Sequence, residues 1–354
     1  MSEKLYMDGT KLSRHLNEVV KWQNDEWFPP LHMEISLSNR CNHRCTFCYI
    51  NWSQGRIDMP EEMIVNLIRD AKQLGVKSAL IAGEGEPTLN KAYVKAIETA
   101  GEVGLDMALN TNAIAMNADD LNTVLPHLLW MRCSMQASNK ELYARLHGTT
   151  ERHFDIAVRN ISTAVDVKRK NNLDVTLGIQ QVLLNENIHD TANLARLAKN
   201  IGVDYYVIKP CHPHEYNTYT KEYGILEEYR EVLEEAEGLS DGNFTASVRW
   251  NFLGEAETPR TYTKCLGLPF IIQIGADGRV STCYPMCDRA NHVYGSLQDM
   301  GIAEILTSKR YQDTWKWVAS NVDVSKCMPC CRQHNVNKYL WWLTEEIPDH
   351  INFI

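Results

Sequence analysis

The sequence predicts an α/β fold in which a partial (β/α)6 barrel is followed by a small α+β domain. Short runs of β-branched and other apolar residues alternate with longer amphipathic stretches between Leu31 and Pro210. After Pro210 this alternation stops, and a cysteine-bearing segment with a hairpin signal follows. Strands that alternate with helical crossovers are parallel neighbours in one sheet, so we expect the first part to close, wholly or in part, as a barrel.

The elements of the predicted barrel follow from hydrophobic periodicity. We expect strands at Leu31–Ser38, Lys77–Ala82, Leu105–Thr111, Leu128–Ser134, Leu173–Val182 and Asp204–Lys209. We expect helices at Glu61–Leu74, Lys91–Val103, Ala157–Asn171 and Asp190–Ile201, where apolar residues recur at helical spacing. Loops at the C-terminal ends of the strands build the site in a parallel barrel, so the chemistry is expected there.

Four segments are expected along the chain. Residues 1–30 form an N-terminal helical extension, 31–215 the barrel, 216–262 a linker, and 263–354 the small domain with a C-terminal tail. The linker contains an acidic helix at Leu226–Ala236. In the small domain, the turn Ala276–Gly278 separates the apolar runs Phe270–Ile274 and Val280–Thr282, which predicts a hairpin.

The composition is that of a globular protein with a sizeable core. Of 354 residues, 44% are hydrophobic and 23% are charged, which argues against disorder. The formal net charge of −9 offers no general attraction to phosphate backbones, so nucleic acid is not an expected partner. No apolar run reaches the ~18 residues that a membrane span needs, and no signal peptide is recognised. We therefore predict a cytoplasmic protein with no membrane partner.

The chain has 11 cysteines, and most of them fall in two groups. Cytosolic cysteines more often bind metals or catalyse reactions than form disulfides. Cys41, Cys45 and Cys48 form the first group, a second group lies between Cys265 and Cys331, and Cys133 and Cys211 stand apart. The grouping therefore predicts metal ligation.

The first group follows the first predicted strand directly. Thiolates are the usual ligands of iron–sulfur clusters, and a short loop can place three of them around one cube. Three local ligands leave one iron open. A zinc site completed by a distant residue, or a core role for Cys48, is the structural alternative.

This loop resembles the signature of the radical S-adenosylmethionine (radical SAM) superfamily: a Cys-x3-Cys-x2-Cys spacing with an aromatic residue, here Phe47, before the third cysteine. The resemblance implies a [4Fe-4S] cluster whose open iron chelates S-adenosyl-L-methionine. Reductive cleavage then gives methionine and a 5′-deoxyadenosyl radical, with flavodoxin or ferredoxin as the electron donor.

The resemblance extends to the end of the second strand. Gly83, Glu84, Gly85, Glu86 and Pro87 match the turn that binds the methionyl group in this family, although Glu84 separates the glycines. The glycines permit close backbone approach. The further cofactor contacts that the resemblance and the strand ends imply are Asn110, Asn112, Ser134, Gln180 and the adenine-packing Ile208. Capping of helices and turns is the alternative role of the polar residues.

The second cysteine group resembles the SPASM and shorter Twitch domains of this superfamily. We expect Cys265, Cys283, Cys327 and Cys330 to bind one auxiliary [4Fe-4S] cluster, which favours Twitch because two clusters ask for roughly eight thiolates. Cys287 and Cys331 are then surplus, and either could replace a chosen ligand. Structural zinc is the alternative.

The resemblance indicates the radical chemistry but leaves the substrate open. Only forty residues precede Cys41, which favours a small polar substrate (a sugar, sugar nucleotide or aminoglycoside) over a peptide. We expect a two-electron oxidation, with a radical epimerase, a peptide or protein maturase and a non-catalytic electron carrier as alternatives. The candidate catalytic residues after the sixth strand are Lys209, Cys211, His212 and His214, and a solvated loop is the alternative role of the histidines.

Overall fold

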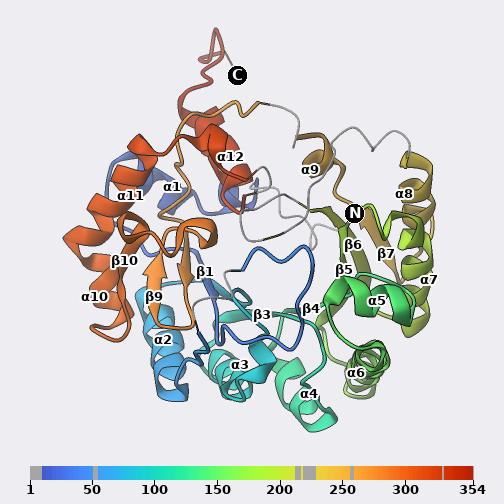
Figure 1. Ribbon diagram of the computed structural model, residues 1–354. Coiled ribbons are helices and arrows are strands. Elements are labelled where there is room, and N and C mark those ends of the chain that lie inside the picture. The colour runs from blue at the N-terminus through green and yellow to red at the C-terminus, as the bar shows by residue number, and fades with distance from the viewer. Residues whose placement is uncertain are drawn as a thin grey trace.

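The strands of the protein form one continuous sheet in the computed structural model, which describes residues 10–50, 55–211, 217, 229–255, 259–328 and 331–353. The strand order is β10-β9-β8-β1-β2-β3-β4-β5-β6-β7. Neighbours from β8 through β1 to β7 are parallel, and β8, β9 and β10 pair antiparallel. Figure 1 shows helices surrounding the curved sheet, so the predicted barrel fold is confirmed.

The described elements alternate along the chain as predicted. The strands are β1 (His32–Ile35), β2 (Ser78–Ile81), β3 (Asp106–Thr111), β4 (Trp130–Ser134), β5 (Thr176–Leu183), β6 (Tyr205–Pro210), β7 (Thr245–Val248), β8 (Ile271–Ile274), β9 (Arg279–Ser281) and β10 (Val293–Ser296). The helices are α1 (Leu16–Gln23), α2 (Glu61–Leu74), α3 (Ala92–Val103), α4 (Ala118–Val124), α5 (Lys140–His147), α6 (Glu151–Lys170), α7 (Thr191–Ile201), α8 (Arg230–Glu237), α9 (Trp250–Glu255), α10 (Ile302–Thr307), α11 (Lys309–Asn321) and α12 (His334–Thr344).

All six expected barrel strands are present, and the differences lie at their ends and between them. Helix α6 begins at Glu151, six residues before the predicted start at Ala157: its first three residues are polar, but Phe154 in the same turn already packs against the core. Strand β7 lies in the segment predicted to be a linker and pairs with β6. The acidic helix is α8, and the start of its predicted range, residues 226–228, lies outside the described residues.

Each barrel strand presents alternate residues to opposite faces of the sheet. Met33, Ile35, Leu109, Met131 and Ile179 are almost fully buried and belong to the main hydrophobic core, which they share with the surrounding helices. Their sequence neighbours therefore face the barrel interior. These inner residues are largely polar, and they include Glu34, Asn110, Arg132, Ser134, Gln180 and Tyr205.

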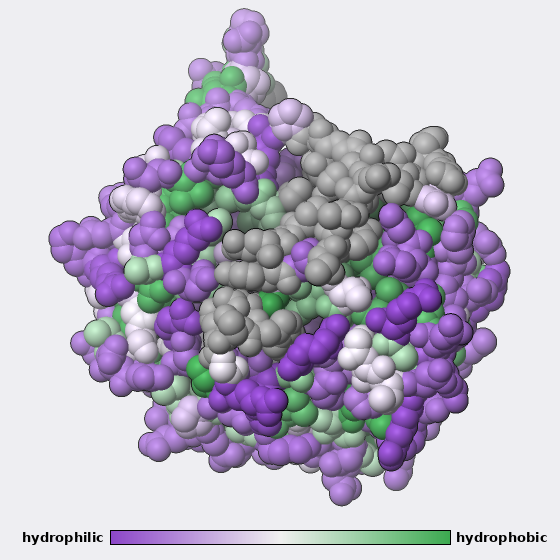
Figure 2. Space-filling view, in the orientation of Figure 1, coloured by the Kyte–Doolittle hydropathy of each residue, from purple (hydrophilic) through white to green (hydrophobic). Residues whose placement is uncertain are grey.

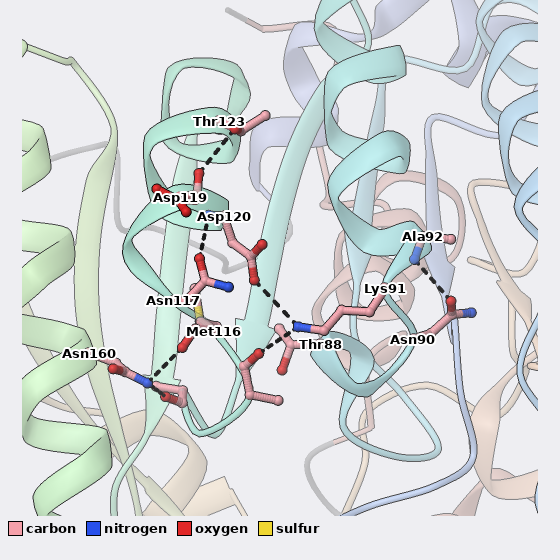
Figure 3. Close-up of polar contacts among 12 residues, drawn as sticks. Thr88, Asn90, Lys91, Ala92, Met116, Asn117, Asp119, Asp120, Thr123 and Asn160 are labelled. Atoms are coloured by element: carbon pink, nitrogen blue, oxygen red, sulfur yellow. Dashed lines mark hydrogen bonds and ion pairs between the residues drawn. The ribbon is translucent and has the colours of Figure 1, made fainter.

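Side-chain amides fix the loop that follows β3 (Figure 3). Asn160 of α6 donates to the carbonyls of Ala113 and Met116 at 2.8 and 3.1 Å. Asn117 caps α4 by accepting from the backbone of Asp120 at 2.9 Å. Ala113 has a φ of 63°, a conformation that is costly for a non-glycine residue and is held here by these bonds. The polar residues at the end of β3 are thus held in a rigid loop.

The small domain continues the sheet of the barrel. Strand β8 lies parallel to β1, with Glu34 opposite Gln273, and then turns into the predicted hairpin with β9. Phe270 also packs with Phe28 and Leu340 in a second core that joins the N-terminal and C-terminal segments. Hydrophilic residues cover most of the described surface in the view of Figure 2. Within the described residues, no helix is long and apolar enough to cross a membrane.

Candidate active site

The cysteine loop that follows β1 is held from two sides by backbone hydrogen bonds. Arg44 and Thr46 donate to the carbonyls of His147 and Leu146 at 2.9 and 3.1 Å, which ties the loop to the end of α5. The backbone of Glu86 donates to the carbonyl of Arg40 at 2.8 Å, which ties it to the turn after β2. The loop is therefore held in place by its backbone, and its thiols are left for ligation.

The surroundings of the three thiols in this loop disfavour their deprotonated, thiolate form. Burial, together with the negative charges of Glu86 and Cys48, raises the pKa of Cys41 to about 12. Burial raises the pKa of Cys45 well above its usual range and also raises that of Cys48. A bound cation would reverse this preference, because metal ligation deprotonates thiols outright. The three thiols suit a metal centre and not a free thiolate nucleophile.

The spacing of the thiols distinguishes a cluster from a single ion. A tetrahedral zinc with Zn–S bonds of about 2.3 Å would bring its sulfurs to about 3.8 Å of one another. Among the described residues, no three thiol sulfurs lie within 4.8 Å of one another. The wider separation suits a cube-shaped iron–sulfur cluster, and the residues present therefore fit a [4Fe-4S] group held by Cys41, Cys45 and Cys48.

A buried histidine contacts the middle cysteine. His147 Nδ1 lies 3.4 Å from Cys45 Sγ, and the His147 ring stacks on Tyr143 with a centroid distance of 4.1 Å. Burial holds the pKa of His147 well below its usual range, so the ring is neutral. His43, Cys45 and His147 also form the one compact group of possible metal ligands among the described residues. With Cys45 as a predicted ligand of the cluster, His147 is placed to donate a hydrogen bond to its sulfur.

The turn after β2 approaches β1 closely, and glycine makes this possible. Gly83 has a φ of 106°, and a Cβ there would lie 2.0 Å from Ser36 Oγ. Ser36 accepts from the backbone of Glu84 at 3.1 Å and also bonds the Tyr284 hydroxyl at 2.7 Å. A Cβ at Gly85 would lie 2.3 Å from the carbonyl oxygen of Arg40. Both glycines are therefore required for the turn to dock on the cysteine loop.

Glu86 connects this turn to the end of β3. Its carboxylate accepts from Thr88 Oγ1 and Thr111 Oγ1 at 2.6 Å each, and from the backbone of Asn112 at 2.7 Å. Burial raises its pKa, and these bonds oppose that rise. Asn112 in turn donates to Asn42 in the cysteine loop at 2.6 Å. Glu86 and Asn112 together thus connect the turn after β2, the end of β3 and the cysteine loop.

The other predicted site residues occupy different environments. Asn110 and Gln180 face the interior, and Ser134 lies opposite Gln180 in the sheet. Ile208 is fully buried in the main core, whereas Lys209, the next residue of β6, is partly exposed. Cys211 is buried in the main core as well. His212 and His214 lie outside the described residues, and the roles of all these residues stay predictions.

Four thiols of the small domain, those of Cys265, Cys283, Cys327 and Cys331, lie close enough to influence one another's pKa. The pKa of Cys265 is raised by burial and by the neighbouring thiols of Cys331, Cys283 and Cys327. Cys330, predicted as the fourth ligand, lies outside the described residues, and Cys331 is the described member of that pair. Cys287 is not among the thiols that raise the pKa of Cys265: burial and, next in size, the negative charge of Glu84 raise its own pKa to about 12.

The barrel interior contains a charged network that the sequence motifs did not indicate. Glu34 forms an ion pair of 2.6 Å with Arg332, which follows Cys331 directly. Arg332 also contacts His32 Nε2 at 3.1 Å, and Arg132 donates to Asn110 at 3.1 Å. A charged residue at an inner position of a predicted strand is the signal that could have found Glu34 and Arg132.

Two protein families match the parts of the chain described above. Residues 35–198 match the Radical SAM superfamily, and residues 265–338 match the SPASM family, an iron-sulfur cluster-binding domain. The chain therefore contains a radical SAM domain followed by an SPASM domain. A radical SAM domain implies a [4Fe-4S] cluster and S-adenosylmethionine, and the SPASM domain implies auxiliary iron–sulfur binding, so the predicted cofactors are confirmed.

Curated relatives of this radical SAM protein differ in the activity that their names give. A probable GTP 3′,8-cyclase of Saccharolobus islandicus (strain M.14.25 / Kamchatka #1) is 26% identical over 59% of this chain and 67% of its own. A protein of Pyrococcus furiosus, named as modifying the cofactor of tungsten-containing aldehyde ferredoxin oxidoreductase, is 20% identical over 84% and 86%. The match to the Radical SAM family indicates an enzyme, and the names of these relatives leave its reaction class open.

Solved structures agree with the fold. Streptococcus suis SuiB bound to S-adenosylmethionine has a TM-score of 0.68 at 17% identity, covering 92% of this chain and 75% of SuiB. Native anSMEcpe with bound AdoMet has a TM-score of 0.55 at 18% identity, covering 82% and 84%. At these identities the likeness concerns the fold alone.

Proposed function

We propose that the protein cleaves S-adenosylmethionine reductively and uses the 5′-deoxyadenosyl radical to oxidise a small polar substrate, such as a sugar or sugar nucleotide, by two electrons. Cys41, Cys45 and Cys48 would hold the cluster, which when bound would supply the electron for cleavage. The radical takes one hydrogen atom from a carbon that bears a hydroxyl, giving 5′-deoxyadenosine. Loss of the hydroxyl proton and of one electron to an auxiliary cluster then forms the carbonyl.

The observation that carries this proposal is the direct connection between the auxiliary thiols and the barrel interior. Arg332 follows Cys331 and reaches Glu34 on β1, the strand that leads into the cysteine loop. The electron acceptor and the radical source would thus both border one polar interior. We place the reaction in the cytoplasm, where a flavodoxin or ferredoxin supplies the reducing electron.

Epimerisation is the second candidate, and Cys287 favours it. This thiol is not among those that raise the pKa of Cys265, and it lies near Glu84 in the turn after β2. A pKa of about 12 keeps it protonated at neutral pH. A hydrogen-atom donor must be a thiol and not a thiolate, so Cys287 is in the form that quenching a substrate radical requires.

Replacing Cys41, Cys45 and Cys48 together with alanine tests the radical chemistry. The variant should form no 5′-deoxyadenosine, because the ligands of the reducing cluster are gone, whereas replacing Cys133, a buried core thiol, should leave its formation intact. Continued cleavage by the triple variant would refute the proposal.

Turnover in deuterated water separates the two candidate reactions once a substrate is found. Oxidation predicts that substrate hydrogen appears in 5′-deoxyadenosine, that no deuterium enters the product carbon, and that Cys287→Ala still turns over. Solvent deuterium at an inverted carbon, lost together with product in Cys287→Ala, would show an epimerase.

A further inference from the structure

Arg132 is a buried cation on the inner face of the barrel. It is 8% exposed, and alternation along β4 directs it away from Met131 and Cys133, which lie in the outer core. Its guanidinium donates to Asn110 Oδ1 at 3.1 Å and to the Tyr205 hydroxyl, and it lies 4.9 Å from the ring centroid of Trp130. All of these partners are neutral.

The carboxylate that could neutralise Arg132 is already engaged. Glu34 is 7% exposed, and its Oε1 lies 2.6 Å from Arg332 Nη2. No carboxylate of the described residues lies within 4.0 Å of Arg132. The positive charge of Arg332 repels that of Arg132. Two guanidinium groups therefore share one carboxylate. The network carries one net positive charge on a chain whose formal net charge is −9.

A buried charge without an opposite partner is costly, and proteins retain such groups where a ligand supplies the missing charge. Guanidinium groups match the planar, bidentate geometry of carboxylate and phosphate oxygens. Gln273, opposite Glu34 in the sheet, is 2% exposed, and its Oε1 has no hydrogen-bond partner. Because that atom only accepts, it suits a ligand hydroxyl beside the anionic group.

We propose that Arg132 and Arg332 bind an anionic group of the substrate, a phosphate or a carboxylate, inside the barrel. This inference rests on the proposed function and refines it: a phosphorylated or acidic sugar fits the site, and a cationic aminoglycoside does not. Glu34 then acts as a positioning residue, since its ion pair holds Arg332 in place and limits the positive charge to one unit.

The sign of the charge gives the test. Binding of inorganic phosphate and of acetate would be measured by calorimetry on the anaerobically reconstituted holoenzyme, saturated with S-adenosylmethionine at constant ionic strength. Arg132→Gln should weaken binding by at least about tenfold, whereas Arg132→Lys, which keeps the charge but loses the planar fork, should weaken it less. Glu34→Gln should tighten binding, because the amide oxygen still accepts from Arg332 and holds it in place while the competing negative charge is gone. Arg69→Gln, on the exposed face of α2, is the matched control and should change nothing.

The outcomes are distinguishable. Phosphate preferred over acetate indicates a phosphorylated substrate, and the reverse preference indicates a carboxylate. Unchanged binding in Arg132→Gln, or weaker binding in folded Glu34→Gln, would overturn the anionic site. Formation of 5′-deoxyadenosine by the unmodified enzyme tests the proposed function separately, so a failure of the anion site leaves that result standing.

Discussion

Replacing His147 with phenylalanine should lower the reduction potential of the cluster held by Cys41, Cys45 and Cys48. His147 Nδ1 lies 3.4 Å from Cys45 Sγ. A ligating thiolate can only accept, so Nδ1 carries the proton and donates it. The ring is 1% exposed and stacks on Tyr143. Phenylalanine keeps the stacked ring and removes the donor.

The expected shift follows from the strength of such a bond. A hydrogen bond to a charged group contributes about 1.5–3 kcal/mol, and the more negative reduced cluster gains more of it than the oxidised one. A difference of about 1–1.5 kcal/mol between the two oxidation states corresponds to roughly 40–65 mV for a one-electron couple. The variant should be harder to reduce by this amount and should cleave S-adenosylmethionine more slowly.

An anaerobic redox titration followed by electron paramagnetic resonance measures this shift, using the signal that changes when S-adenosylmethionine is added. The matched control is His153→Gln. His153 Nδ1 bonds His43 Nε2 at 3.0 Å, and His153 makes no described contact with a cluster thiol, so its variant should stay within about 10 mV. An unchanged or more positive potential in His147→Phe, at full iron content, would refute the hydrogen-bond argument.

Three further outcomes are expected. Reconstituted protein should hold about eight irons, and Cys265→Ala should lower the iron content while formation of 5′-deoxyadenosine continues. Gly85→Ala should impair cluster retention, because its Cβ would lie 2.3 Å from the Arg40 carbonyl, whereas nothing lies within 4 Å of a Cβ at Gly301, so Gly301→Ala should be silent. Burial and the positive charge of Arg332 lower the pKa of His32 to about 3. Below pH 6.5, His32 is therefore protonated in the unfolded chain but stays neutral in the folded chain. Between pH 6.5 and 5.5 the wild type should lose about 1 kcal/mol more stability than His32→Gln in urea unfolding, and equal losses would contradict this.

The barrel could be predicted because its signals are local. Buried strands and amphipathic helices each leave a periodic pattern in a short window, and the resulting ranges agree with the structure to within a few residues at most strand ends. Strand β7 was missed because four residues, Thr245–Val248, give too short a pattern in a segment with no flanking periodicity. Its place is set by pairing with β6, a tertiary contact.

The residues of the site also fall into two sets: local motifs that the sequence indicates, and contacts that only the folded structure shows. Cys41, Cys45, Cys48 and the turn beginning at Gly83 are contiguous motifs, so sequence alone indicated them. The ion pair of Glu34 and Arg332 joins residues 298 positions apart, and no local sequence pattern predicts such a contact. The contact of His147 with Cys45 likewise depends on how the end of α5 docks on the cysteine loop.

Strand β1 explains why these parts keep a fixed relation. Its alternation places His32 and Glu34 inside, and Ser36 just beyond its end continues the pattern, while Met33 and Ile35 lock the opposite face into the core. Glu34 holds Arg332, the residue after Cys331, and Ser36 holds the turn after β2. A slip of one residue in the pairing of β1 would exchange the two faces. The burial of Met33 and Ile35 therefore stabilises the geometry of the site as well as the fold.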